Sequence, residues 1–226
     1  MALILQIETS TPSCSVALAE NGQLLAKKER TEANIHAGSI TLFIEELMQV
    51  SGKSYRDLNA VAVSMGPGSY TGLRIGVSTA KGLCYGLDIP LIAISTLQAM
   101  AAAKQPMANV QTLLCPMIDA RRMEVYMALF DNELAIKQEV KAEILDGHTF
   151  DAYLQNYQIL LFGDGAEKCK TLYSGPQFSF AEHENSAADL STLAFQKYQQ
   201  AAFEDLAYFE PFYLKEFMIT KPKGTV

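Results

Sequence analysis

The chain has 226 residues, of which 49% are hydrophobic and 19% are charged, so it can bury a sizeable core and is not a disordered polymer. Its formal net charge of −7 disfavours a protein that clamps a phosphate backbone without help. If nucleic acid is involved, we expect another subunit to supply the basic surface.

The cysteines and the first residues indicate a compartment. The four cysteines stand far apart at positions 14, 84, 115 and 169, and no Cys-x-x-Cys pair occurs, so we expect free thiols in a reducing environment. The opening "MALILQIETS" lacks the basic start and long apolar run of a signal peptide, and no apolar stretch reaches 18 residues. The expected location is the cytoplasm, without membrane contact.

The first hundred residues predict alternating strands and helices. Residues 3–8 form an apolar strand, and residues 14–29 form a hairpin around Asn21 and Gly22, because both residues of this tight turn need positive φ. Helices are predicted over residues 34–50 and 71–87, with a strand over 58–65 between them. A further strand follows at 90–94, and Ser95 or Thr96 caps the next helix.

The pattern then restarts 111 residues later. Six positions match or swap one acid for another: Ile7, Glu8, Ala17, Leu18, Glu20 and Asn21 meet Ile118, Asp119, Ala128, Leu129, Asp131 and Asn132. With a later strand at 157–162 and a helix at 187–200, the order of three strands, helix, strand and helix occurs twice. The alternative is that two hairpins share turn chemistry. We predict an α/β fold with two similar lobes, residues 1–105 and 106–226.

Each predicted lobe places an acidic residue at the end of its first strand. Hydroxyl and N–H groups near Glu8 suit a phosphate, the two carboxylates suit hydrated Mg²⁺, and a Gly-Asp-Gly turn lets backbone approach a nucleoside. The predicted nucleotide cleft comprises Glu8, Thr9, Ser10, Thr11, Ser15, Asp119, Arg121, Gly163 and Gly165. The alternative is ordinary turn chemistry. No GxxxxGK[ST] motif occurs, which argues against a P-loop.

The segment "MGPGSYTGLRIGVSTAKGLCYG" raises a different possibility. On the predicted helix 71–87, small residues including Gly72, Gly76 and Gly86 share one stripe, and each helical glycine costs about 0.5–1 kcal/mol relative to alanine. Close approach of another backbone is the expected reason, either within the chain or from a partner. The helix 34–50 has a wider apolar arc than one sheet covers, which favours a helix-on-helix interface with a second chain. Gly76→Leu should then abolish association and leave the monomer folded. The predicted interface residues are His36, Ile40, Ile44, Met48, Tyr70, Gly72, Leu73, Arg74, Gly76, Thr79 and Leu83.

Three segments, "ILQIETSTPSCSVAL", "GPGSYTGLRIGVSTAKGLCYGLDIPLIAISTL" and "MIDARRMEVYMALF", with "EPFYLKE" near the end, resemble the TsaB (YeaZ) family. The long glycine-rich string is specific, whereas residues 131–200 are less diagnostic. The resemblance implies two RNase H-like lobes of the actin/sugar-kinase/Hsp70 (ASKHA) type. It also implies a non-catalytic subunit that organises a TsaD-type transferase for threonylcarbamoyladenosine modification of tRNA beside the anticodon. A TsaE-type ATPase, a homodimer in the absence of the transferase, and only indirect contact with tRNA are further implications.

The resemblance also bears on catalysis. The catalytic relative carries two histidines spaced i, i+4 at a helix start, and the corresponding positions here are Thr96 and Met100, which do not replace two imidazoles. The three histidines of this chain, His36, His148 and His183, lie far apart in sequence. We therefore expect no metal, no catalytic residue and no required cofactor, with ATP or ADP and Mg²⁺ at the inter-lobe or subunit interface left open. The alternative is a self-sufficient ATP-binding ASKHA enzyme that uses the inter-lobe cleft.

Overall fold

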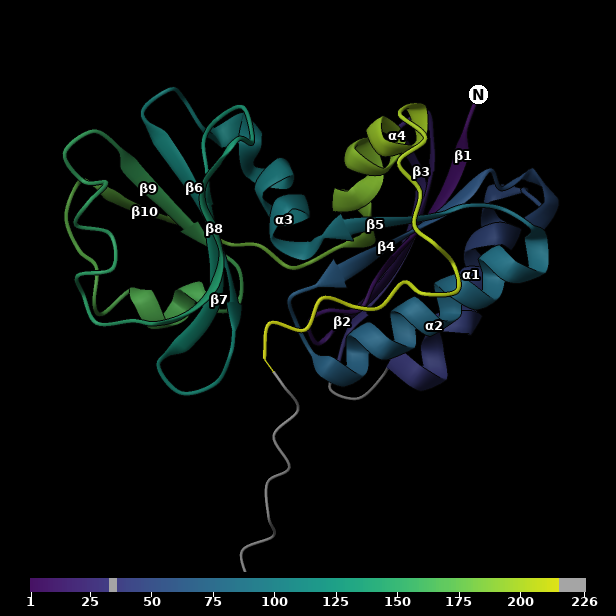
Figure 1. The fold of residues 1–226 in the computed structure, drawn as a ribbon, viewed down its shortest axis with the longest axis horizontal. Helices are drawn as coiled ribbons and strands as arrows, with labels where there is room; N and C mark the ends of the chain where they lie inside the picture. Colours follow the sequence, from purple (N-terminus) through teal and green to yellow (C-terminus); the bar gives the residue numbers. More distant parts are fainter. Residues whose placement is uncertain (33–35, 216–226) are drawn as a thin grey trace, which may run out of the picture.

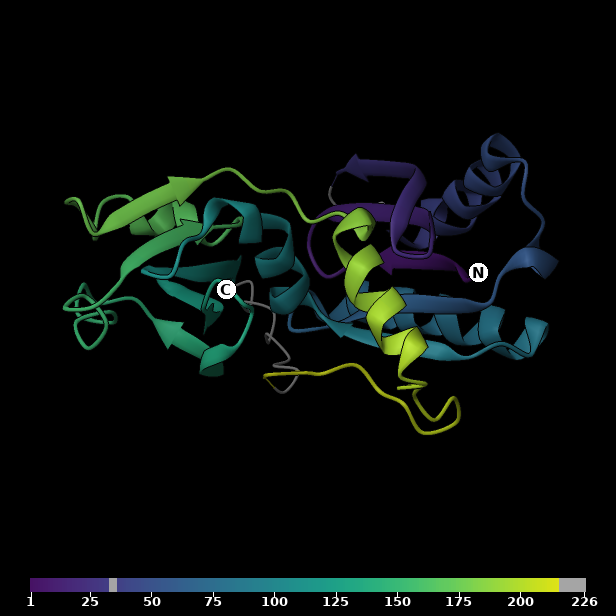
Figure 2. The same ribbon diagram turned by 90° about the horizontal axis from the view of Figure 1, so that it is seen from above.

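The structure is a computed structural model that describes residues 1–32 and 36–215. Two five-stranded sheets form two lobes that lie side by side (Figures 1 and 2). The first sheet contains β1 (Leu3–Glu8), β2 (Ser13–Glu20), β3 (Gln23–Thr31), β4 (Ala60–Gly66) and β5 (Leu91–Ser95). The second contains β6 (Thr112–Asp119), β7 (Glu124–Phe130), β8 (Ile136–Ile144), β9 (Gln158–Phe162) and β10 (Phe178–Ala181).

The two sheets share one topology. Their strand orders are β3-β2-β1-β4-β5 and β8-β7-β6-β9-β10, with antiparallel hairpins first and parallel strands after them. The predicted α/β fold with two similar halves is thus confirmed. The predicted hairpin turn is also confirmed, because Asn21 and Gly22 have φ of 52° and 80°.

Two long helices cover one face of the first sheet. These are α1 (His36–Ser51) and α2 (Tyr70–Leu87), and they pack on Leu5, Ile7 and Val63 of the sheet (Figure 1). Ser69 caps α2, since its hydroxyl accepts a hydrogen bond from the N–H of Gly72 at 3.2 Å. Among the described residues, no helix is long and apolar enough to cross a membrane.

The helix that follows each sheet packs on the opposite lobe. After β5, α3 (Thr96–Lys104) buries Leu97 and Met100 against residues of the second sheet. After β10, α4 (Ser191–Gln199) buries Leu193 on the first sheet, on the face away from α1 and α2. The prediction that residues 106–226 form the second lobe is therefore wrong for this helix, because its apolar side is matched by the first sheet.

The second lobe also has less helix than the repeated pattern predicted. Residues 149–156, between β8 and β9, form turns, and the segment after β9 contains only the 3₁₀ helix η3 (Ala166–Cys169). The other 3₁₀ helices are η1 (Tyr55–Asp57), η2 (Gln105–Met107) and η4 (Ala187–Leu190). The structure repeats the sheet, whereas it does not repeat the helices that cover it.

Residues 204–215, called here the C-terminal strap, return along the first lobe beside α2 (Figure 1). The N–H of Glu204 donates to the carbonyl of Leu91 at 2.9 Å, so the strap begins on the edge strand β5. Lys81 of α2 donates to the carbonyls of Ala207 and Phe209 at 3.2 and 3.1 Å. The strap thus covers one edge of the first sheet and one side of α2.

Candidate functional site

The turn between β1 and β2 is closed by the chain itself. Thr9, Ser10, Thr11 and Ser15 are all buried. The Thr9 hydroxyl donates to the carbonyl of Gly72 at 2.8 Å, and the N–H of Ser69 donates to the carbonyl of Ser10 at 2.6 Å. The electropositive N-terminus of α2 therefore faces carbonyl groups of this turn, in the place where the predicted site would put a phosphate.

The glycines of α2 allow this contact. A Cβ atom on Gly72 would lie 2.0 Å from the Thr9 carbonyl oxygen, and one on Gly76 would lie 2.3 Å from the Thr9 hydroxyl. Leu73 is 1% exposed and belongs to the core. The prediction that these three residues contact a partner is wrong, because Thr9 of the protein's own turn lies against Gly72 with its backbone and against Gly76 with its side chain, and Leu73 is buried. Gly76→Leu should consequently disturb the fold.

Glu8 serves the same closed turn. Its carboxylate is 1% exposed and accepts hydrogen bonds from the N–H of Ser10 at 2.6 Å and from the Ser64 hydroxyl at 3.0 Å. Burial raises the pKa of Glu8, and the hydrogen bonds from Ser10 and Ser64 oppose that rise. The Glu8 carboxylate is therefore closed to the hydrated Mg²⁺ that the sequence predicted beside it.

The matching turn in the second lobe is open. Asp119 is 44% exposed, pairs with Lys168 at 2.5 Å and accepts the N–H of Arg121, which is itself exposed. Asp164 accepts the N–H of Asp119 at 2.9 Å, and a Cβ on Gly163 would lie 2.3 Å from the Met117 carbonyl oxygen. Gly165 likewise packs on Ile118. The structure thus brings Asp119, Arg121, Gly163 and Gly165 together at the ends of β6 and β9.

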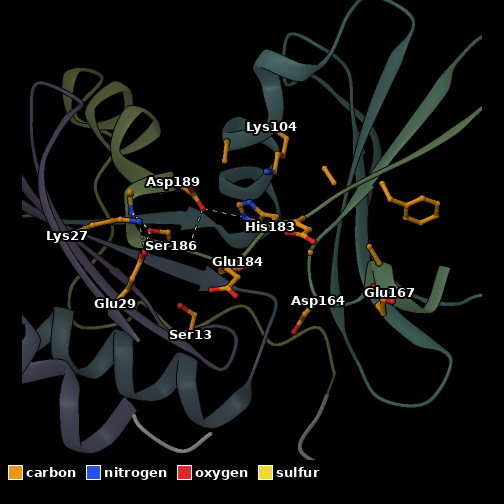
Figure 3. Close-up of a pocket in the computed structure, with 18 of the residues that line it drawn as sticks. Ser13, Lys27, Glu29, Lys104, Asp164, Glu167, His183, Glu184, Ser186 and Asp189 are labelled. Carbon is orange, nitrogen blue, oxygen red and sulfur yellow. Dashed lines mark hydrogen bonds and ion pairs between the residues drawn. The ribbon is translucent and has the colours of Figure 1, made fainter. Parts of the chain in front are cut away.

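A cavity of about 1100 Å³ separates the lobes (Figure 3). Ser13, Lys27 and Glu29 line it from the first lobe, Asp164 and Glu167 line it from the second, and residues 182–189 cross between them. Of the predicted cleft residues, Gly163 alone lines this cavity within the described chain. Sequence reasoning missed the other lining residues, which come from separate elements; the polar run "EHENSAAD" was their one local signal.

His183 and Asp189 form a pair in the wall of this cavity, with Nε2 and Oδ2 3.4 Å apart (Figure 3). Burial lowers the pKa of His183 to about 4, and the charge of Lys104 adds to the shift. Burial raises the pKa of Asp189 to about 7, and Glu8 and Glu29 add to it. Both directions favour the uncharged forms, so this pair is held as neutral groups more than as an ion pair.

The other predicted interface residues differ in their surroundings. Ile40 and Met48 of α1 are 2% and 3% exposed, so the prediction of direct partner contact is wrong for them, because this side of α1 faces the sheet. Ile44 is 2% exposed, but it lines a groove between α1 and α2. Tyr70 and Arg74 lie toward the strap, where Arg74 sits over the Tyr70 ring at 5.1 Å. Thr79 and Leu83 are half-buried, and the side chain of His36 lies outside the described residues.

A groove of about 260 Å³ lies between α1 and α2. Its lining residues are Thr41, Ile44, Tyr55, Ser78, Thr79, Gly82 and Leu83. On α2, three residues after Gly82, Tyr85 is 83% exposed. Ser78, Gly82 and Gly86 follow each other at four-residue spacing on the solvent side of α2, and no atom of residues 1–32 or 36–215 lies within 4 Å of a Cβ built on either glycine. We call this surface the outer face of α2.

Comparison with known proteins places the chain in a family. The sequence profile of the tRNA N6-adenosine threonylcarbamoyltransferase (TsaD) family matches residues 29–224. The chain belongs to this family. The "tRNA threonylcarbamoyladenosine biosynthesis protein TsaB" of Escherichia coli K12 is 40% identical over 130 residues, which are 58% of this chain and 55% of that protein. The predicted resemblance to TsaB (YeaZ) is confirmed, and the match spans about half the length of that curated relative.

Solved structures confirm the two-lobed ASKHA-type fold. A Pseudomonas aeruginosa protein described as similar to the peptidase YeaZ superposes with a TM-score of 0.80 at 24% identity, over 95% of this chain and 100% of that chain. The activator of 2-hydroxyisocaproyl-CoA dehydratase from Clostridium difficile, solved with bound ADPNP, gives a TM-score of 0.53 at 10% identity, over 90% and 98% of the two chains. At these identities the likeness shows the fold alone.

Family membership makes the start of α3 informative. Thr96 and Met100 are 0% and 1% exposed, and the Met100 methyl group lies 2.5 Å from where a Cβ on Gly163 would be. A thioether and an unbonded hydroxyl thus fill the space between the lobes at these two positions. In the described residues, no three His, Cys, Asp or Glu side chains converge as metal ligands would.

Proposed function

We propose that this chain is a non-catalytic subunit that binds a TsaD-type transferase and organises it for threonylcarbamoyladenosine modification of tRNA. The observation that carries the proposal is the start of α3, where the family's expected histidine pair is replaced by Thr96 and Met100, both buried. A buried methionine packed against Gly163 leaves neither ligands nor space for a catalytic metal there. The matched TsaB relatives support the assignment to this biosynthesis.

The outer face of α2 is the surface we assign to the partner. Gly82 and Gly86 each destabilise the helix by about 1 kcal/mol relative to alanine, and no contact among the described residues explains them. Close approach of a second backbone is the steric reason that remains, and the neighbouring groove and exposed Tyr85 supply apolar area for it. The same face would form the homodimer in the absence of the transferase.

The closed β1–β2 turn shapes our proposal for nucleotide. The hydroxyl of Thr9 is bonded within the chain, so we propose that this turn holds no phosphate and that the chain needs no cofactor of its own. Where the complex uses ATP or ADP with Mg²⁺, we place the nucleotide at the subunit interface. We propose that a TsaE-type ATPase and tRNA meet this chain through the transferase.

The test of this function compares two substitutions that add the same side chain. Gly82→Leu places it on the outer face of α2, and Thr192→Leu places it on exposed α4, on the other side of the first sheet. Light-scattering chromatography with the organism's TsaD-like protein should show a one-to-one complex that only Gly82→Leu abolishes. A complex unaffected by Gly82→Leu would refute the assigned face.

The role itself is tested by tRNA modification. The transferase mixture should modify tRNA with this chain present and lose that activity when Gly82→Leu replaces it. Full activity of the transferase without this chain would refute the scaffold role. Steady ATP hydrolysis by the pure chain, lost in Asp119→Ala, would support the alternative enzyme.

A further inference from the structure

We infer that the end of the C-terminal strap is a latch between the lobes: residues 210–215 tie the start of α2 to the second lobe, so the first turn of α2 loosens when the lobes move apart. This segment has the sequence "EPFYLK", which belongs neither to the groove beside α2 nor to the lining of the cavity. The inference concerns contacts within this chain and does not depend on the transferase partner.

The first attachment of the latch joins the strap to the segment that leads into α2. The N–H of Phe212 donates to the carbonyl of Met65 at 2.7 Å. The Phe212 carbonyl oxygen lies against Gly66, where a Cβ atom would be only 2.6 Å away, and Gly66 has a φ of 114°. Any other residue at this position would be strained and would push on the backbone of the strap. The loop before α2 is therefore shaped to admit the strap.

Aromatic rings extend this attachment onto the first turn of α2. The ring of Tyr213 lies against that of Tyr70, the first residue of α2, with the ring centroids 4.6 Å apart. Arg74, one turn further along, lies over the Tyr70 ring at 5.1 Å. Such ring contacts stabilise beyond the area that they bury. The start of α2 is thus held by the strap as well as by the β1–β2 turn, whose Ser10 carbonyl accepts the N–H of Ser69.

The second attachment reaches the other lobe. Lys215 forms an ion pair with Glu124, the first residue of β7, through Nζ and Oε2. Figure 1 shows the strap, in yellow, passing along α2 and ending beside the second lobe. The two side chains are 44% and 21% exposed, so their attraction is modest and is screened by salt. This attachment is therefore the one that opens first.

The short length of chain between the two attachments couples them. Lys215 follows Phe212 by three residues, over which an extended backbone spans at most about 11 Å. The lobes therefore cannot separate at this edge unless the ion pair breaks or the strap pulls away from Met65 and Tyr70. Once the ion pair is broken, Tyr213 loses the anchor on one side of it, and its contact with Tyr70 opens more often. Lobe separation and loosening of α2 are thus linked through six residues.

Amide hydrogen exchange measured by NMR tests the latch in the pure chain. Lys215→Glu replaces attraction to Glu124 by repulsion, so the hydrogen-bonded amides of Leu73 and Phe212 should exchange about threefold faster or more. Adding Glu124→Lys restores opposite charges and should return both rates to within about twofold of wild type. The matched control is Lys137→Glu, since Lys137 is 38% exposed and pairs with Asp131 inside the second lobe. It should leave both amides unchanged.

A distance between the lobes gives a second, independent readout. Spin labels on Glu45→Cys in α1 and Glu139→Cys in β8 sit on exposed positions of the two lobes, and the chain's own cysteines are buried. Lys215→Glu should broaden and lengthen the label-to-label distance distribution, and Glu124→Lys should restore it.

Three results would overturn the inference. Unchanged exchange at Leu73 in Lys215→Glu would show that the strap end does not hold α2. Faster exchange without a change in the label distance would show that it does not join the lobes. An equal effect of Lys137→Glu, or failure of Glu124→Lys to restore either reading, would mean that the change follows net charge and not this ion pair.

Discussion

The two outward glycines and the two inward glycines of α2 predict opposite effects of one substitution. In Gly72→Ala, the new methyl group would lie 2.0 Å from the Thr9 carbonyl oxygen and 3.3 Å from the Ser69 Cβ atom. The Thr9 carbonyl belongs to the backbone and cannot rotate away as a flexible side chain can. The β1–β2 turn or the start of α2 must therefore move. In Gly82→Ala, the methyl group would meet no atom of the described residues within 4 Å.

The magnitudes follow from these contacts. Overpacking at Gly72 costs roughly 1–3 kcal/mol, and displacing the buried hydrogen bond from Thr9 to the Gly72 carbonyl costs roughly 1–3 kcal/mol more. The helix propensity of alanine returns about 1 kcal/mol. The free energy of unfolding should therefore fall by about 1–5 kcal/mol in Gly72→Ala. It should rise by about 0.5–1 kcal/mol in Gly82→Ala, where only propensity changes.

Thermal unfolding of the pure variants checks this difference. For a chain of this size, 1 kcal/mol shifts Tm by roughly 2–4 °C, so Gly72→Ala should lower Tm by roughly 2–20 °C and Gly82→Ala should raise it slightly. Equal shifts in the two variants would refute the reasoning, because the identical chemical change would then be insensitive to what surrounds it. A fall in Gly82→Ala alone would place an unseen contact on the outer face.

Three further predictions concern the strap, the second lobe and the thiols. Lys81→Met removes two hydrogen bonds to strap carbonyls, so strap amides should exchange hydrogen about tenfold faster by mass spectrometry while core amides do not change. Gly163→Ala should destabilise strongly in urea, because φ is +97° and the methyl group would lie 2.3 Å from the Met117 carbonyl oxygen; a wild-type midpoint would contradict this. Burial raises the pKa of Cys14 to about 11 and that of Cys169 to about 12, from about 9 when unfolded. The folded chain keeps protons that the unfolded chain releases, so stability should fall as pH rises from about 9 to about 11, and Cys→Ala at both sites should flatten that decline.

The local sequence pattern was sufficient to predict most strands and helices and the duplication of the sheet. The Asn21-Gly22 turn has positive φ at both residues, as the dipeptide predicts, and Ser69 caps α2 where the sequence placed its start. These features depend on neighbours within a few residues, through turn geometry, capping and hydrophobic period. The predicted repeat is present in the structure as the same strand order in both sheets. The alternation of apolar and polar residues that marks each strand can be read directly from the sequence.

What approaches each glycine was decided only by the tertiary structure. A stripe of glycines indicates close packing, but its sequence does not say whether the approaching backbone comes from the same chain. Folding brings Thr9 onto Gly72 and Gly76 across more than sixty residues, and it leaves Gly82 and Gly86 in the open.

The cavity between the lobes is likewise a product of tertiary structure. Glu29, Asp164 and Glu184 come from three separate elements, and they share one space only because the lobes exchange their last helices. The sequence by itself determined the two sheets and the family. Tertiary packing decided which predicted sites are filled by the chain and which remain open, because distance through space is set by long-range contacts that no local pattern contains.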